Sequence, residues 1–563
     1  MRQRLLSTMF CAVVIAASCQ TSTPSPTLPQ DASLGSPAPE SADMHPKLAA
    51  EQMLRVDIGK EPGSLDPMTL GAPEVLRALQ RPLVEFNENQ EIVSALAEMW
   101  RVSDDGLTLT FDLREAQYSN GDPIVAGDFV YSARRLADPR TKADYAYVMG
   151  RVVGGPELVA MAGAHPNDAA IESALDNLGV SAPDDTTFVV QLVRPAPHFL
   201  SELTLYVLVP LQEDWITSPE ATEAGNFVSS GPFILDTWEH ESRIVLKRNP
   251  FWWGGIKPTL NEIHMSMAGP APALLAYEAG EIDIAEVPTE DVERVTSDPL
   301  LAAEYLEAPQ RSIGFYSFNI VEGPTANKAF RVALTQAIDK QALIESAWAG
   351  LGQGASSVVM PGIPGHQPDL NPYPYDLDAA RRHMDQALAG LGVSSAAQLG
   401  PLKLRFPFGR GHEARVAFLA EAWRQAFGLE IEQVGTDFGV FLDDRTAGNF
   451  DIAVDGWGAD YPQAVNQLDG LFTCGGGHNH SKYCNPAFDA LLDRAAAEPE
   501  PGMQVELYEE AQTLLMNDAP ILPLRFPVRP YAIKPYVFGV TPTLTDFLVP
   551  GDYHYETIQI LEH

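Results

Sequence analysis

Apolar and polar residues alternate most clearly over residues 107–113. Every second residue there is apolar: Leu107, Leu109, Phe111 and Leu113. Because successive side chains of a strand point to opposite faces, this pattern predicts a strand with one buried face. The Asp-Asp-Gly sequence that ends at Gly106 is typical of a hairpin turn. We therefore expect a hairpin whose second strand covers residues 107–113.

Longer stretches show apolar residues at helical spacing. We expect helices at residues 73–83, 271–280, 326–349, 376–391, 413–427, 438–447, 486–497 and 503–517. Short apolar runs predict strands at residues 53–58, 282–284 and 313–319. Helices that alternate with strands favour lobes in which helices cover sheets, so the predicted fold class is α/β.

Residues 450–461 combine a strand pattern with candidate binding chemistry. Apolar residues predict a short buried strand at residues 450–454, followed by Gly456, Trp457 and Gly458 and then by Asp460. Glycine has no side chain to hold another chain at a distance, so an extended ligand could pair with this backbone. Asp460 would supply a fixed negative charge for a cationic group such as a free α-amine. The alternative is a strand that ends in a capping aspartate.

Length and charge limit the classes of protein to consider. A chain of 563 residues is too long for one core, and its length suggests about three domains at roughly 150 residues each. Lys and Arg number 37 against 75 Asp and Glu, which gives a net charge of −38. Such a surface repels nucleic acid and anionic lipid, so neither is an expected partner of the folded body.

The N-terminus has the features of an export signal. Arg2 and Arg4 precede an apolar run at residues 5–17 that is too short to span a bilayer. The sequence Ala-Ala-Ser-Cys that ends at Cys19 resembles a bacterial lipobox, so we expect residues 1–19 to be a signal and Cys19 to be lipidated. Residues 20–47 are rich in Ser, Thr, Pro and Ala, which predicts a disordered tether.

Of the four cysteines, Cys11 lies in the expected signal and Cys19 would carry lipid, which leaves Cys474 and Cys484. In an oxidising compartment, and with three glycines between them to permit a tight bend, they predict a disulfide that closes a small loop. A Cys2His2 zinc site that adds His478 and His480 is the alternative. Structural zinc sites usually contain a closer cysteine pair, so the disulfide is favoured and no metal is expected.

Several motifs follow one another in an order and at separations that are typical of one protein family. They are the run 96–136 around Gly106, Ser-Gly-Pro-Phe at 230–233, Val-Leu-Lys-Arg-Asn-Pro-Phe-Trp-Trp-Gly at 245–254, and Phe-Arg-Val-Ala-Leu with Ala-Ile-Asp-Lys at 330–340. Together they resemble the family 5 extracellular solute-binding proteins of ABC importers, and in particular the oligopeptide-binding proteins. The resemblance extends from about Met53 to Tyr555.

This resemblance implies a two-lobed clamshell of the periplasmic-binding-protein type (class II) with an inserted region. Lobe 1 would comprise residues 48–86, 216–310 and 525–563, the inserted region residues 87–215, and lobe 2 residues 311–524. Crossings near Gln310 and Leu524 would form the hinge. The expected partners are a peptide ligand and the membrane permease of an ABC importer. The protein would be a monomer, lipid-anchored on the outer face of the cytoplasmic membrane or in the periplasm. Gln20, the residue after the expected lipidated cysteine, leaves sorting to the outer membrane open.

The resemblance also assigns candidate ligand-binding residues. Asp460 matches the position that pairs with the α-ammonium of a peptide, with Gly456, Trp457 and Gly458 beside it. Weaker matches are Ala72, Tyr145 and Arg445, the last for the ligand's carboxylate. A second family arginine is replaced here by Val454, which leaves the preferred peptide length open.

The sequence leaves other ligands and one other class of activity to consider. Similar clamshells capture oligosaccharides, nickel chelates, haem or opines. A sugar-binding protein would stack its ligand on aromatic side chains and would need no charge pair at Asp460. An exported hydrolase is the rival from another class. The sequence contains no Gly-x-Ser-x-Gly elbow, no His-Glu-x-x-His helix and no Gly-x-x-x-x-Gly-Lys loop, so we expect neither an enzyme, nor catalytic residues, nor a cofactor.

Overall fold

The strand with alternating residues forms as predicted. β5 (Thr108–Leu113) buries every second side chain and pairs antiparallel with β4 (Ala97–Val102). Gly106 has a φ of 69°, a conformation that glycine adopts without strain, at the turn between them. β7 (Thr187–Gln191) and β6 (Val180–Asp184) complete a four-stranded sheet in the order β4-β5-β7-β6.

The computed structural model describes residues 47–69, 71–162 and 167–563, and residues 48–563 form one unit. The expected signal at 1–19, Cys19 and the tether at 20–47, except for Lys47, lie outside the described residues. No helix in the described part is both long enough and apolar enough to cross a membrane.

A seven-stranded sheet is built from segments far apart in the sequence. Its order is β12 (Tyr305–Pro309), β19 (Val528–Ile533), β11 (Ile284–Glu286), β1 (Met53–Asp57), β10 (Glu262–Ser266), β9 (Arg243–Arg248) and β8 (Phe233–Glu239). All of these strands fall within the segments expected for lobe 1. The domain boundaries themselves stay a prediction.

A six-stranded sheet contains the stretch around Asp460. Its order is β14 (Gln353–Gly354), β18 (Ile521–Phe526), β13 (Ser312–Phe318), β17 (Ile452–Gly458), β15 (Leu402–Pro407) and β16 (Ile431–Thr436). β17 pairs antiparallel with β13 along its whole length and parallel with β15 at Ile452 and Ala453.

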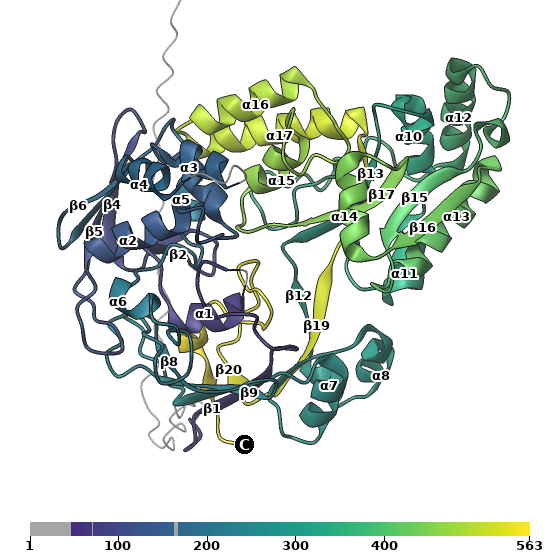
Figure 1. The fold of residues 1–563 in the computed structure, drawn as a ribbon. Coiled ribbons are helices and arrows are strands. Elements are labelled where there is room, and N and C mark those ends of the chain that lie inside the picture. The colour runs from purple at the N-terminus through teal and green to yellow at the C-terminus, as the bar shows by residue number, and fades with distance from the viewer. Residues whose placement is uncertain (1–46, 70, 163–166) are drawn as a thin grey trace, which may run out of the picture. The chain divides into compact units, whose positions relative to one another are not determined.

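Two links connect these sheets. β12 leads through Gln310 and Arg311 into β13, and β18 leads through Pro527 into β19. The peptide N–H of Gln310 donates to the carbonyl oxygen of Pro527 at 3.2 Å. β12 and β19 are antiparallel neighbours and lie side by side (Figure 1).

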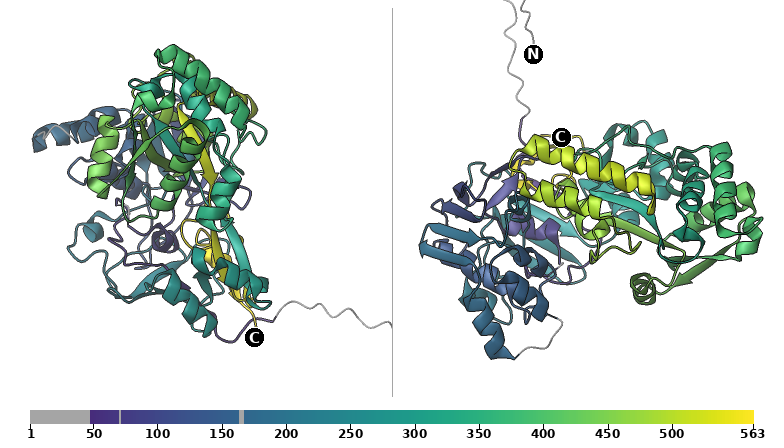
Figure 2. Two further views of the ribbon diagram at one scale, coloured as in Figure 1. Left: turned by 90° about the vertical axis from the view of Figure 1, so that its right-hand side faces the viewer. Right: turned by 90° about the horizontal axis from the view of Figure 1, so that it is seen from above.

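Helices surround the sheets. In chain order they are α1 (Pro73–Leu79), α2 (Ala126–Ala137), α3 (Gly155–Met161), α4 (Asp168–Asp176), α5 (Phe199–Glu202), α6 (Glu213–Ile216), α7 (Pro270–Glu278), α8 (Val292–Ser297), α9 (Leu301–Glu304), α10 (Lys328–Gln336), α11 (Lys340–Trp348), α12 (Leu377–Leu391), α13 (Glu413–Phe427), α14 (Phe438–Ala447), α15 (Ala464–Phe472), α16 (Pro486–Ala497) and α17 (Pro501–Asp518). The last two lie side by side (Figures 1 and 2).

Two sequence expectations need correction. The helix expected at 326–349 is two helices, α10 and α11, because the side chain of Asp339 caps the second by accepting from the peptide N–H of Ala342. The strand expected at 450–454 runs instead over Ile452–Gly458. Ser312 of β13 pairs opposite Gly458, so the ladder continues through the Gly-Trp-Gly sequence.

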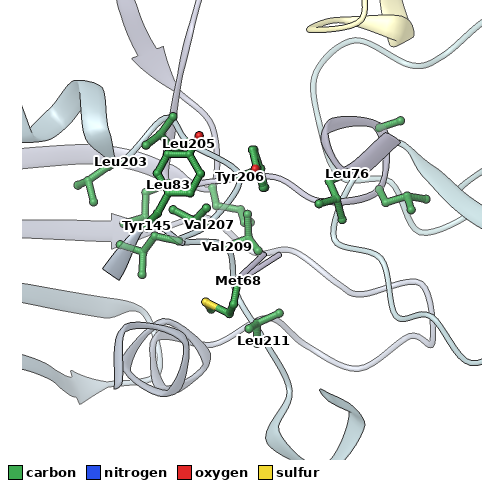
Figure 3. Close-up of a cluster of buried hydrophobic side chains, with 14 of the residues drawn as sticks. Met68, Leu76, Leu83, Tyr145, Leu203, Leu205, Tyr206, Val207, Val209 and Leu211 are labelled. Carbon is green, nitrogen blue, oxygen red and sulfur yellow. The ribbon is translucent and has the colours of Figure 1, made fainter. Parts of the chain in front are cut away.

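A hydrophobic cluster joins α1 to Tyr145 and to residues 203–211, which lie within the range expected for the inserted region. Figure 3 shows its members, which include Met68, Leu76, Leu83, Tyr145, Leu203, Leu205, Tyr206, Val207, Val209 and Leu211. All are buried. The ring of Tyr206 meets that of Tyr145 edge-on at 6.0 Å between centroids. The cluster therefore fixes the position of the Tyr145 ring, whose hydroxyl reaches Asp460.

Candidate ligand-binding site

Asp460 lies two residues beyond the end of β17 and is half-buried. Its carboxylate accepts hydrogen bonds from the hydroxyls of Tyr145, at 3.1 Å, and Tyr147, at 2.8 Å. Both tyrosines come from the segment that contains the short 3-10 helix Ala146–Arg151, within the range expected for the inserted region. The structure thus brings together two residues that the sequence singled out, Asp460 and Tyr145, and adds Tyr147.

The two groups that donate to the Asp460 carboxylate are neutral phenols. Burial raises the pKa of Tyr145 and of Tyr147, and the negative charge of Asp460 raises both further. The two phenols therefore stay protonated and donate. Within the described part of the chain, no cationic side chain pairs with the Asp460 carboxylate.

Two residues that the sequence analysis missed hold the backbone here. Arg311 donates from Nη1 to the carbonyl oxygen of Asp460 at 2.8 Å, and burial lowers its pKa to about 10. Asn466 accepts through Oδ1 from the peptide N–H of Asp460 at 3.2 Å and from Nε1 of Trp457 at 2.9 Å. Arg311 directly precedes β13 and is 149 positions from Asp460, so only the tertiary fold relates the two. Asn466 belongs to α15 and follows Asp460 by six positions.

Asp460 borders a cavity of about 250 Å³, which we call the Asp460 cavity. Other residues of its wall are Tyr147, Arg151, Trp457, Asp469 and His478. Arg151 donates from Nε to both carboxylate oxygens of the buried Glu202, at 2.8 and 2.9 Å. Arg151 is therefore engaged by Glu202, and the two acids of the cavity wall are Asp460 and Asp469.

A second cavity of about 290 Å³ runs beside β13 and β17, and we call it the strand cavity. Gly456, Trp457 and Gly458 line it, and Trp457 borders both cavities. The register of β17 with β15 ends at Ala453, so on that side the described residues provide no strand partner for residues 454–458. A free strand edge beside a cavity can accept an extended backbone.

The two glycines differ in what surrounds them. A Cβ on Gly456 would lie 2.9 Å from the carbonyl oxygen of Ile313, a backbone atom of β13. A Cβ on Gly458 would meet nothing within 4 Å. The close approach at Gly456 is therefore made by the protein's own sheet, whereas Gly458 leaves open space.

Arg445 and Ala72 are not brought to Asp460. Arg445 donates from Nη1 to Oδ1 of Asp455 at 2.8 Å, and Asp455 lines the strand cavity. Ala72 precedes α1 as its N-cap, accepts from the peptide N–H of Leu76 at 2.8 Å, and is 1% exposed. A role in ligand binding stays a prediction for both residues.

The predicted disulfide between Cys474 and Cys484 is present and spans ten positions. The cysteines are therefore not free to serve as the thiolates that the zinc alternative needs. Of the two histidines in the loop, His478 packs against Trp457 with ring centroids 5.0 Å apart, and His480 Nδ1 lies 2.9 Å from Oδ2 of Asp455. Within the described ranges, no three His, Cys, Asp or Glu residues are grouped to hold a metal ion.

Comparison with known proteins decides the family. The family model described as bacterial extracellular solute-binding proteins, family 5 middle, matches residues 91–479. The chain belongs to this family. It is 31% identical over 504 residues to the periplasmic murein peptide-binding protein MppA of Escherichia coli K12, covering 87% of this chain and 91% of MppA. It is 28% identical to the oligopeptide-binding protein OppA of Bacillus subtilis 168, covering 84% and 87%.

Solved structures of family members have the same fold. The unliganded open form of MppA superposes with a TM-score of 0.76 at 28% identity, covering 92% of this chain and 99% of that one. Haemophilus influenzae OppA in complex with the peptide RPPGFSPFR gives 0.72 at 26% identity, covering 92% and 100%. The α/β two-lobed fold class expected from the sequence is confirmed. The family consists of solute-binding proteins, as the sequence motifs indicated.

Proposed function

We propose that this protein captures peptides by their free α-ammonium group at Asp460 and delivers them to an ABC importer. One observation carries the proposal: the Asp460 carboxylate borders a cavity, is oriented by two tyrosine hydroxyls, and has no cationic partner among the described residues. A half-buried carboxylate that forms no ion pair favours a cationic ligand group, and the nearby guanidinium of Arg311 bonds the carbonyl oxygen of Asp460 and not its carboxylate. Removing one partner of a buried charge pair weakens binding by about 2 to 5 kcal/mol.

The rest of the site suits an extended peptide. The edge of β17 from Val454 to Gly458 has no strand partner on the side of β15, although the peptide N–H of Gly456 donates to Oδ1 of Asp455 at 3.0 Å. The remaining main-chain groups of such an edge can bond a ligand's backbone, which does not depend on the ligand's side chains. Trp457 offers an apolar surface to both cavities. The printed names of the relatives support the same class, since MppA is named for murein peptides and OppA for oligopeptides.

The cellular setting is proposed from the sequence. Residues 1–19 would direct export and Cys19 would carry the lipid anchor, with residues 20–47 as the tether. The receptor would act as a monomer on the outer face of the cytoplasmic membrane or in the periplasm, and its protein partner would be a membrane permease. Relatives named as periplasmic binding proteins support this setting.

Mass spectrometry of cargo released by denaturing the purified protein tests this function. We expect peptides with a free N-terminus, and cargo enriched relative to an Asp460→Asn sample prepared in parallel. Oligosaccharides, chelates or other cargo without a primary amine, retained equally by both proteins, would contradict the proposal.

A further inference from the structure

One loop of the chain touches the walls of both cavities. The disulfide closes residues 474–484, which we call the disulfide loop. His478 of this loop borders the Asp460 cavity and packs on the ring of Trp457, with 5.0 Å between the ring centroids. His480 Nδ1 lies 2.9 Å from Oδ2 of Asp455, which borders the strand cavity. A change in the loop would therefore reach both candidate ligand cavities.

The second half of the loop is held without the help of the disulfide. The buried Asn479 donates from Nδ2 to the carbonyl oxygens of Thr473, at 3.0 Å, and Tyr483, at 2.6 Å. Its Oδ1 accepts from the peptide N–H of Tyr483 and from the hydroxyl of Ser481. Because none of these bonds involves a cysteine, residues 479–483 should keep their shape when the bridge opens.

The first half, residues 474–478, depends more on the bridge. It contains three consecutive glycines, and His478 at its end is exposed. Besides the bridge, peptide N–H groups hold this half: those of Cys474, Gly476 and His478 donate to Asp489, Thr473 and Gly470. Glycine gains more conformational freedom on release than any other residue. Opening the bridge should therefore free His478 more than His480.

The bridge is accessible to reagents in solution. Cys484 is exposed and Cys474 is half-buried. Exposed disulfides are reduced more readily than buried ones, and they include the regulatory ones. The sequence has four cysteines, of which Cys11 and Cys19 precede the described residues. A thiol reagent would therefore act on the folded body at this one bridge.

Trp457 connects the loop to the binding site. Its ring borders both cavities, packs against His478, and is held at Nε1 by Oδ1 of Asn466 at 2.9 Å. If His478 moves away, the bond to Asn466 remains, so the ring gains freedom but keeps its place. The hydrogen bonds to the Asp460 carboxylate do not involve the loop. Opening the bridge should therefore weaken ligand capture without abolishing it.

We propose that the bridge between Cys474 and Cys484 is a thiol–disulfide exchange site at which a dithiol partner lowers the affinity of the binding site for its ligand. The inference rests on the proposed function, because it concerns the regulation of the same site. The partner is defined by its chemistry, a pair of thiols that can form a disulfide in turn. The closed bridge corresponds to the state of high affinity and the open bridge to the state of low affinity.

The exchange takes place in two steps. A thiolate of the partner attacks Sγ of Cys484, the exposed sulfur, the S–S bond breaks, and Cys474 leaves as a thiolate that takes up a proton. The partner's second thiolate then attacks the partner's sulfur in the mixed disulfide, and Cys484 leaves and is protonated. This protein gains two electrons and two protons, and the partner is oxidised to a disulfide.

Calorimetry on the two redox states tests the proposal. Tetraalanine is titrated into the oxidised protein and into protein treated with dithiothreitol, which is then removed under nitrogen. Alkylation and peptide mapping by mass spectrometry verify that Cys474 and Cys484 are reduced. We expect the affinity to fall by about two- to tenfold, the effect of ordering one more side chain on binding, and to recover on reoxidation. Hydrogen exchange should become faster in residues 474–478 and stay the same in residues 479–483.

Variants assign the effect to the bridge and to the contact that it controls. The double variant Cys474→Ser with Cys484→Ser should bind like reduced wild type and should not respond to dithiothreitol. His478→Ala should have the same lowered affinity and respond little to reduction, since the contact that reduction loosens is already absent. His563→Ala is the control and should respond as wild type does, because His563 is exposed and borders neither cavity.

The outcomes separate the failure of this inference from that of the proposed function. If the oxidised protein binds tetraalanine and the fully reduced protein binds it equally well, peptide capture stands and the exchange site is refuted. A bridge that dithiothreitol does not open in the folded protein refutes it as well. If the oxidised protein binds no peptide, the proposed function fails and the inference fails with it.

Discussion

The hydroxyl of Tyr147 donates a 2.8 Å hydrogen bond to the carboxylate of Asp460, although the two residues are 313 positions apart in the chain. Tyr145 makes a second such bond to the other carboxylate oxygen. Together they connect the segment expected as the inserted region to the end of β17. The two tyrosine hydroxyls orient the carboxylate and bring no positive charge to it.

Removing one of these hydroxyls should weaken ligand capture moderately. Tyr147→Phe deletes a donor to Asp460 and leaves the ring in place, so we expect a loss of about 0.5 to 1.5 kcal/mol in the binding free energy of tetraalanine. Tyr145→Phe should act in the same direction. Titration calorimetry measures the effect, with Tyr305→Phe as the control because Tyr305 bonds to Glu307 and borders neither cavity. Unchanged affinity in both site variants would contradict the orienting role.

The two glycines of β17 should respond differently to alanine. Gly456→Ala places a methyl group 2.9 Å from the backbone carbonyl of Ile313, so we expect a lower melting temperature. Gly458→Ala has open space and should keep the melting temperature, while its methyl group obstructs the ligand and lowers peptide affinity. Thermal unfolding and calorimetry on both variants separate the two effects. A Gly458→Ala protein with full affinity would show that the ligand does not approach there.

The disulfide should stabilise the folded state. Cys474 and Cys484 close a loop of ten positions, and a loop of that length is worth about 2 to 3 kcal/mol through the restricted unfolded chain. Replacing both cysteines by serine should lower the free energy of unfolding in urea by that amount. Peptide affinity should fall as well, because the loop carries His478, which packs against Trp457. An unfolding free energy equal to that of wild type would contradict the first expectation.

His198 should make the protein sensitive to acid. Burial, followed by the charges of Arg151 and Arg194, lowers the pKa of His198 from 6.5 to about 3. Between these values the unfolded chain binds a proton that the folded one does not, so stability falls as the pH decreases below 6.5, by at most about 1.4 kcal/mol per pH unit. His198→Asn should flatten this dependence. Urea unfolding at pH 7, 5 and 4 measures it, with the exposed His563→Asn as control; equal slopes in all three proteins would refute the assignment.

Local patterns in the sequence were sufficient for much of the fold. The alternation at 107–113 specified β5, and the helical spacing at 413–427 and 486–497 gave the bounds of α13 and α16. The prediction from sequence was wrong where local tendencies and tertiary pairing oppose each other. Glycines usually weaken a strand, so β17 was expected to end before Gly456, but the pairing of β13 up to Ser312 overrides that tendency.

The candidate site could be predicted only in part. Asp460, Trp457 and Tyr145 stand in recognisable motifs, and the structure places Trp457 and Asp460 on a common cavity wall and Tyr145 on the Asp460 carboxylate. Arg311 carries no local signal, because it is 149 positions from Asp460 and reaches its carbonyl oxygen only through the tertiary fold. Asn466 is six positions from Asp460, but no motif marks its side chain as the acceptor for the peptide N–H of Asp460.

The most direct measurement of the central claim is a calorimetric cycle that combines Asp460→Asn with N-acetylation of the ligand. Wild type should bind tetraalanine at least about tenfold more tightly than N-acetyl-tetraalanine, whereas Asp460→Asn should bind both equally weakly, since the removed charge pair is worth about 2 to 5 kcal/mol. If acetylation weakens binding by the same factor in both proteins, or in neither, Asp460 does not hold the ammonium group of a peptide.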